Sequence, residues 1–117
     1  DSTAAVFMSA TAGEQIAEKI IELSNTIGAM EQAVIFDATA SEVTDAALDY
    51  IQNLLKFNER KNNRIISNRR FSPGYGDFKI QNQQLFFYIL ELEKLGLTLL
   101  DSYLIKPEKS VTAIAAI

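Results

Sequence analysis

Residues 96–117, G-L-T-L-L-D-S-Y-L-I-K-P-E-K-S-V-T-A-I-A-A-I, decide the fold. Within them 97–105 and 110–117 are short apolar runs on either side of Pro107, a pattern typical of buried strands. Because only a few residues join the two runs, an antiparallel hairpin is the simplest pairing. The end of the chain therefore predicts a small, mainly antiparallel sheet.

A helical pattern precedes these strands. Residues 80–95 place Leu85, Ile89 and Leu92 on one predicted inward face, and Gly96 ends the pattern. Residues 58–79 before it are polar and contain glycine and proline, which predicts a long loop. Loops of that length in compact domains are usually functional or mobile.

The N-terminal part predicts a strand and then a helix. Residues 3–11, T-A-A-V-F-M-S-A-T, favour a buried strand. Thr11 or Gly13 then opens a helix over 13–27, which Gly28 ends. Its predicted inward side chains recur at steps of three and four residues: Ile16, Ile20, Leu23 and Ile27.

A second helical stretch begins near Met30 and continues to about residue 55. Its predicted inward side chains are Val43, Ala47, Tyr50 and Leu54. Ser41 is a candidate N-cap, so the pattern permits one helix or two that meet near 39–41.

The resulting order is β-α-α-loop-α-β-β, an α/β protein of the α+β type. We expect one domain over 1–117, with helices packed on the small sheet. Edge strands left open by so small a sheet would be free to pair. We therefore expect an exposed edge near Val6-Phe7-Met8, or a dimer or completing chain that covers it.

The composition excludes several classes of protein. The chain has neither Cys nor His, which excludes disulfides, thiolate metal sites, and Ser-His-Asp and Cys-His catalysis. It has no apolar run near the ~20 residues that a membrane span needs. Residues 1–5 lack the basic and apolar regions of a signal peptide. These features predict a cytoplasmic protein with no membrane partner.

The net charge of −4 conceals an asymmetry between segments. Residues 1–55 carry nine acidic residues and one basic residue, whereas 56–70 carry six basic residues and one acidic residue. The basic segment is either a solvated loop or a surface for an acidic partner or ligand. Nucleic acid is not the expected partner, because only Phe57 and Phe71 accompany these charges and the rest of the chain is acidic.

Residues 70–77, R-F-S-P-G-Y-G-D, carry the most chemical information. Two glycines and a proline in eight residues constrain the backbone to an unusual path. Arg70 at its start can grip a carboxylate with its guanidinium fork, and Tyr75 can lie against a flat ligand. The alternative is a tight turn with Tyr75 packed down and Arg70 in a surface ion pair.

This stretch resembles the R-x-x-x-G-Y signature of the activation domain of cobalamin-dependent methionine synthase. The flanking residues agree: 96–99, G-L-T-L, 101–103, D-S-Y, and 107–112, P-E-K-S-V-T, are similar to segments that follow the signature in that family. Residues 35–38 and 43–50 resemble the helix that precedes it. The resemblance covers most of the chain.

The resemblance implies a module that binds S-adenosylmethionine and presents its methyl group to cob(II)alamin. A corrinoid-binding domain or protein would hold the cobalamin, and a flavodoxin-type donor would supply the electron. By position Arg70 would hold the methionine carboxylate, and Phe71 would contact the ligand through its backbone. Tyr75, which follows Gly74 of the signature, would lie toward the cobalamin, and Asp45 would be an acidic group near the ligand. No residue would act as acid or base, since the transfer depends on positioning two cofactors.

The sequence departs from the family at several points. Family domains are about twice this length, and a further acidic ligand contact and a downstream tyrosine have no counterpart here. Ala113 stands where the family usually has glycine. A second hypothesis therefore stays open: a non-catalytic interaction domain that docks a corrinoid protein through the 56–70 segment without binding the ligand.

Overall fold

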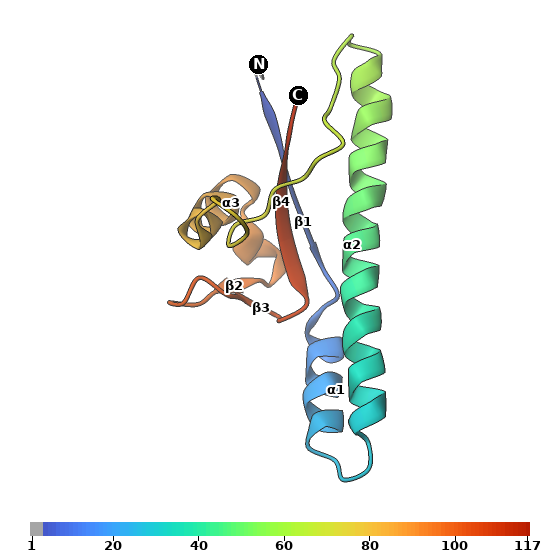
Figure 1. Ribbon diagram of the computed structural model, residues 1–117. Helices are drawn as coiled ribbons and strands as arrows, with labels where there is room; N and C mark the ends of the chain where they lie inside the picture. The colour runs from blue at the N-terminus through green and yellow to red at the C-terminus, as the bar shows by residue number, and fades with distance from the viewer. Residues whose placement is uncertain (1–3) are drawn as a thin grey trace.

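The computed structural model describes residues 4–117 and confirms the α+β class, with helices packed on a small antiparallel sheet. Its elements are β1 Ala5–Thr11, α1 Glu14–Ser24, α2 Met30–Arg60, the 3-10 turn Ile80–Asn82, α3 Gln83–Leu90, the 3-10 turn Leu92–Leu95, β2 Thr98–Leu99, β3 Ile105–Lys106 and β4 Ser110–Ala116 (Figure 1). The stretch from residue 30 onward is one helix, not two. Thr3 of the predicted first strand lies outside the described residues.

The central sheet pairs the two ends of the chain. Antiparallel strands β1 and β4 align Ala5 with Ala116 and Thr11 with Ser110. The predicted hairpin between 97–105 and 110–117 is therefore wrong. Instead β2 pairs with β3 inside the first of these runs, because the chain already reverses between Leu100 and Leu104, whose backbone N–H and C=O bond at 2.9 Å.

Both faces of the β1–β4 sheet are covered, which explains the continuous apolar runs in its strands. One face packs on α2 through a cluster of buried residues: Met8, Leu48, Ile66, Ala113 and Ala115. The other face packs on α3 and the β2–β3 hairpin through a second cluster: Phe86, Phe87, Leu92, Leu97 and Ile105. Phe7 meets Phe86 edge to face at 5.0 Å between ring centroids. The sheet thus lies between two helical layers (Figure 1).

The buried face of α2 differs from the predicted one. Ala33, Ala40, Thr44, Leu48 and Gln52 are buried along it. Val43, Tyr50 and Leu54, predicted to face inward, are about half or more exposed, and only Ala47 is partly covered. The helix carries two apolar faces, and the sheet and α1 pack against the one with the smaller side chains.

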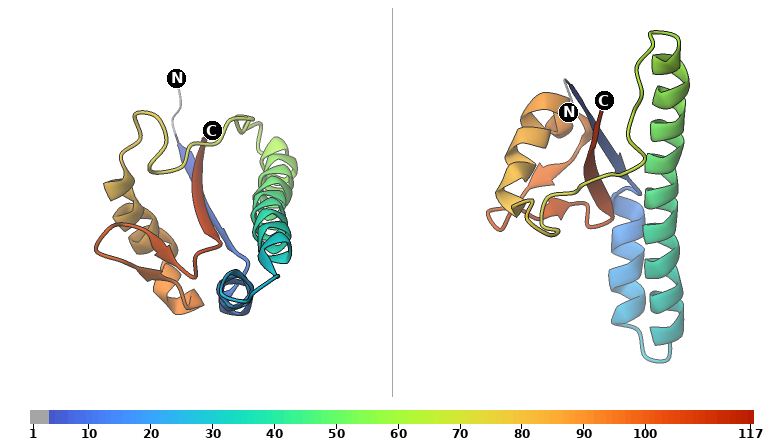
Figure 2. Two further views of the ribbon diagram at one scale, coloured as in Figure 1. Left: turned by 60° about the horizontal axis from the view of Figure 1, so that its bottom comes forward. Right: turned by 45° about the horizontal axis from the view of Figure 1, so that its top comes forward.

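Helix α1 packs against the N-terminal half of α2 and projects away from the sheet (Figure 2). Ile16, Ile20 and Leu23 are partly covered as predicted, whereas Ile27 lies in the connecting turn, fully exposed. The projection gives the molecule extents of 55 × 29 × 28 Å.

The third predicted helix is interrupted. Glu91 adopts a left-handed conformation (φ 50°) that separates α3 from a 3-10 turn, and Gly96 (φ 86°) ends that turn. Leu92 is buried as predicted, but Leu85 and Ile89 are nearly half exposed. Phe86 and Phe87 fill the core in their place.

The two edges of the central sheet are unequal. The backbone of Ser67 and Phe71 bonds to β4, so this strand is bordered by the loop that follows α2. Within residues 4–117, β1 has no strand partner other than β4, so Val6–Met8 lie at a sheet edge as predicted. None of the helices in this part of the chain combines the length and apolarity needed to cross a bilayer.

Candidate functional site

The loop after α2 is held against the sheet at two points. Ser67 N–H donates to Ala116 C=O at 2.8 Å, and Phe71 exchanges two backbone hydrogen bonds of 2.9 Å with Ile114. Ile66 is buried in the core between α2 and the sheet. These anchors fix the backbone on both sides of Arg70, so its position is set by the sheet.

Arg70 points back to α2. Its Nη1 donates to Asp49 Oδ1 at 2.6 Å and to Gln52 Oε1 at 3.1 Å. Its side chain is 22% exposed, against 65% for Asp49. Within residues 4–117 no protein acceptor is bonded to Nε or Nη2, so part of the guanidinium remains for a ligand.

Gln52 connects the helix to the loop. Its Nε2 donates to Ser67 C=O at 2.6 Å while its Oε1 accepts from Arg70. The side chain is almost completely buried, and both of its polar ends are satisfied. Gln52 is therefore the residue that orients Arg70 from beneath.

The signature turn is built by its glycine. Gly74 (φ 95°) donates its N–H to Phe78 C=O at 2.8 Å, a conformation that a side chain would strain. The turn carries Tyr75 outward, with 76% of its side chain exposed. The alternative hypothesis of a tight turn is therefore wrong for Tyr75, which does not pack down. The ion pair that the same hypothesis predicted for Arg70 is present.

A hollow of about 450 Å³ joins these elements. Its lining residues come from α2, the signature loop and β4: Asp45, Leu48, Arg70, Phe71, Ser72, Tyr75, Gly76 and Val111. The structure thus brings together four of the five predicted site residues, Asp45, Arg70, Phe71 and Tyr75. Gly74 does not line the hollow and acts through the turn.

The lining offers a defined chemistry. A guanidinium and a carboxylate border the same space, which suits a zwitterion with a carboxylate and a positive centre. The exposed faces of Phe71 and Tyr75 offer apolar contact to a flat or sulfur-bearing group. The volume lies within the range of small-molecule sites, about 300–1,000 Å³.

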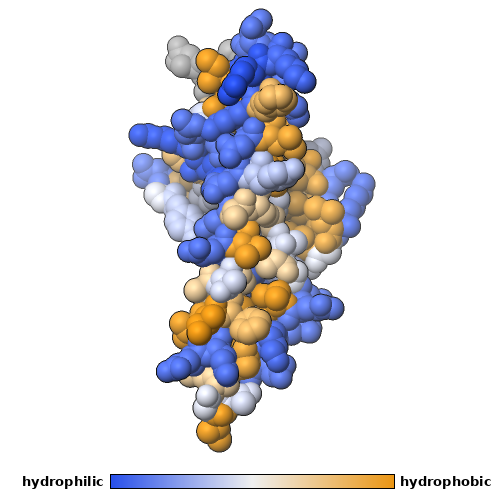
Figure 3. Space-filling view, turned by 90° about the vertical axis from the view of Figure 1, so that its right-hand side faces the viewer, coloured by the Kyte–Doolittle hydropathy of each residue, from blue (hydrophilic) through white to orange (hydrophobic). Residues whose placement is uncertain are grey.

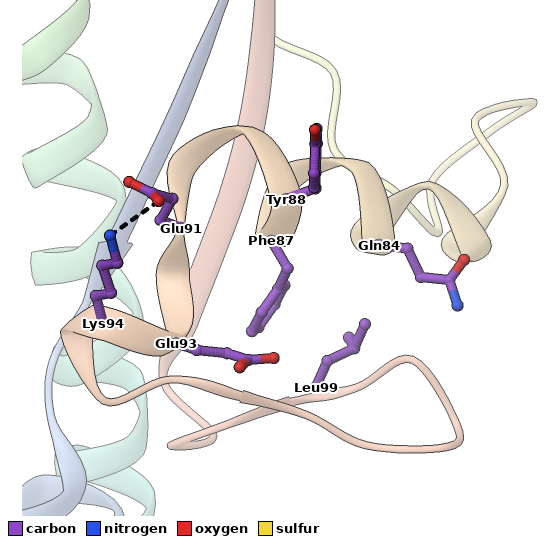
Figure 4. Close-up of a pocket in the computed structure, with 7 residues that line it drawn as sticks. All are labelled: Gln84, Phe87, Tyr88, Glu91, Glu93, Lys94 and Leu99. Atoms are coloured by element: carbon purple, nitrogen blue, oxygen red, sulfur yellow. Dashed lines mark hydrogen bonds and ion pairs between the residues drawn. The ribbon is translucent and has the colours of Figure 1, made fainter.

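A second hollow, of about 520 Å³, lies between α3 and the β2–β3 hairpin. Figure 4 shows Phe87, Glu93 and Leu99 directed toward it, while Tyr88 points away. Lys94 is paired with Glu91 at 2.9 Å. This hollow contains no predicted site residue and offers a carboxylate but no unpaired cation.

Much of the 56–70 basic segment is bonded within the chain. Lys56 bonds to Asn68, Arg64 lies 3.4 Å from Glu59, and Lys61 lies 5.2 Å from the centre of the Phe57 ring. Arg69 is exposed. Of the basic residues in this segment, only Arg64 and Arg70 are paired with carboxylates, Glu59 and Asp49, so most of its positive charge is not offset within residues 4–117.

The sequence reasoning missed Asp49 and Gln52. Together with Asp45 they recur at steps of four and three on α2, a spacing that places them on one side of a helix. The sequence shows this spacing but not that Asp49 pairs with Arg70, because the loop that carries Arg70 returns to α2 21 residues later.

The chain matches no known protein-family model and has no significant match among curated proteins.

Proposed function

We propose that this chain is an S-adenosylmethionine-binding module that supports reductive methylation of cob(II)alamin in a corrinoid-dependent methyltransferase. The observation that carries the proposal is the shared hollow lined by Asp45, Arg70, Phe71 and Tyr75. The sequence predicts Arg70 and Tyr75 from the chemistry of their loop and from the resemblance, and Phe71 and Asp45 from the resemblance. Asp45 belongs to α2 and the other three to the loop, which are separate elements.

The ligand would lie with its charged amino-acid end between the two charged side chains. Its carboxylate would take the guanidinium donors that Asp49 and Gln52 leave unused, and Asp45 would attract its ammonium or sulfonium group. Tyr75, mostly exposed at the mouth, would face the incoming cobalamin of a corrinoid domain or protein. A flavodoxin-type donor would supply the electron to that partner.

Calorimetric titration with S-adenosylmethionine tests the site. Arg70→Lys should weaken binding about ten- to a hundredfold, because an ammonium cannot make two parallel bonds to a carboxylate. Its effect on the free energy of unfolding should stay within about 1 kcal/mol, since the Asp49 partner is mostly exposed. Arg69→Lys, exposed and outside the hollow, is the matched control and should leave affinity unchanged.

Equal small effects from Arg70→Lys and Arg69→Lys, or no binding by the unmodified chain, would contradict a ligand site in the hollow. The second hypothesis, a corrinoid-protein docking domain, would then gain support if a corrinoid protein binds and charge reversal at Arg60 and Arg69 abolishes the binding. Its motivation is the basic segment, of which Arg69 remains exposed.

A further inference from the structure

The outer face of α2 carries a row of apolar and small side chains that are mostly exposed within residues 4–117. We name this row the outer seam; its members are Phe36, Thr39, Val43, Ala46, Ala47, Tyr50, Leu54 and Phe57. Val43, Tyr50 and Phe57 are 58%, 70% and 59% exposed. Figure 3 faces this side of the molecule and shows apolar patches along it, interrupted by hydrophilic ones. Contiguous exposed apolar surface of this kind marks an interaction site.

The spacing of the outer seam is that of a helix–helix interface. Phe36, Val43, Tyr50 and Phe57 recur every seven residues, and the remaining members lie three or four residues from them. A seven-residue apolar repeat keeps one stripe of a helix facing a second, supercoiled helix. The helix α2 lies at one side of the molecule in all views, so a second helix can reach the seam (Figures 1 and 2).

The outer seam is also self-complementary when two copies of α2 lie antiparallel. Reading α2 in the opposite direction about the midpoint between Ala46 and Ala47 places Phe36 opposite Phe57 and Val43 opposite Tyr50. The same reversal places Thr39 opposite Leu54. A two-fold axis requires this self-complementarity, because each copy then offers the same patch to the other.

The shape of the surface follows the same pattern. Small side chains, Thr39 and Ala46, lie in the N-terminal half of the seam, whereas the bulky Tyr50 and Leu54 project from the C-terminal half. In an antiparallel pair, the projecting side chains of each copy would pack over the small residues of the other.

The charges of α2 favour the antiparallel direction. Acidic residues fill its N-terminal part, including Glu31 and Glu42, whereas Lys56 and Arg60 lie near its C-terminal end. Antiparallel pairing brings Glu31 of one copy near Arg60 of the other, whereas parallel pairing opposes like charges. Asp49, which would approach Glu42 of the second copy, is already paired with Arg70 of its own chain.

We propose that the outer seam of α2 binds a second copy of this chain as an antiparallel, two-fold helix pair. The seam extends about 30 Å at the helical rise of 1.5 Å per residue. This surface is separate from the hollow at Arg70, which lies on the side of α2 that faces the loop. The pairing therefore leaves that hollow open.

Sedimentation equilibrium over a concentration series tests the dimer. The average mass should rise from 13.0 kDa toward twice that value as the protein concentration is raised. Val43→Glu should keep the mass at the monomer value. Val34→Glu is the matched control, because Val34 is equally exposed (60%) on the opposite side of the same helix, and it should dimerise as the unmodified chain does. A monomer at all concentrations, or equal effects of both substitutions, overturns the proposal.

Cross-linking tests the direction, and the absence of native cysteine makes single-cysteine variants unambiguous. Ala46→Cys lies at the proposed two-fold axis and should form an intermolecular disulfide on mild oxidation. Phe36→Cys should not, because antiparallel pairing separates the two copies of that position by about 30 Å. Self-cross-linking of Phe36→Cys, or none by Ala46→Cys, contradicts the antiparallel pair even if the chain dimerises through another surface.

Discussion

The molecule contains two regions that pack by different means. The body consists of the β1–β4 sheet, α3 and the C-terminal half of α2, and large side chains such as Phe86 and Leu92 fill its interior. The arm consists of residues 14–44, which form α1, the connecting turn and the N-terminal half of α2, and its buried apolar residues are alanines: Ala17, Ala29, Ala33 and Ala40. Alanine contacts let helices approach closely but remove little apolar area from water. The body should therefore supply most of the stability, and the arm should depend on the continuity of α2.

The largest expected effect is in the body. Phe86→Ala removes a side chain with no exposed surface that contacts Phe7 and Phe78. The transfer and cavity contributions together should lower the free energy of unfolding by about 3–5 kcal/mol. Urea denaturation measures the loss. Leu85→Ala, its half-exposed neighbour, is the control, and an equal loss from both would mean that α3 is not packed as described.

An intermediate effect is expected in the arm. Ala33 is 3% exposed where α2 meets α1, so Ala33→Leu should force the two helices apart. Overpacking of this kind should destabilise the chain by about 1–3 kcal/mol. Hydrogen exchange should localise the change to amides of α1 and spare those of β4. Val34→Leu, exposed on the neighbouring position, should leave both measurements unchanged; exchange that accelerates equally in β4 would contradict the division into body and arm.

The same division explains what the sequence could predict. Continuous apolar runs identified β1 and β4, because a strand that is covered on both faces has apolar residues at successive positions. The pairing of β4 with β1 instead of its neighbour depends on the early reversal at Leu100–Leu104, which propensity does not encode. On α2 the periodicity selected Val43, Tyr50 and Leu54 because they are large, whereas the structure buries the smaller face. Local patterns identify apolar faces but not which partner covers them.

The candidate site shows the same limit. Arg70 and Tyr75 were identifiable because their loop carries Gly74 and Pro73 in an unusual combination, and their place beside Asp45 is a geometric result of the fold. The roles of Asp49 and Gln52 depend on a loop returning to α2 from 15–21 residues away. Such long-range contacts are set by tertiary packing, so no local rule could have assigned them.

The smallest expected effect concerns the joint between arm and body. Lys109, just before β4, reaches α2 with an ion pair of 2.7 Å to Asp37 and a hydrogen bond of 3.1 Å to Ser41. Its side chain is only 16% exposed, but Asp37 is half exposed, so solvent screening should limit the contribution to about 1 kcal/mol. Lys109→Met should lower the free energy of unfolding by that amount and accelerate hydrogen exchange in the arm.

A double-mutant cycle with Asp37→Asn isolates the pair, since the second substitution should add little once the first is made. Lys94→Met, which removes a mostly exposed pair with Glu91 inside the body, is the control. Additive losses from Lys109→Met and Asp37→Asn would show that the two side chains do not interact, and the arm would then be joined to the body only through the backbone and packing of α2.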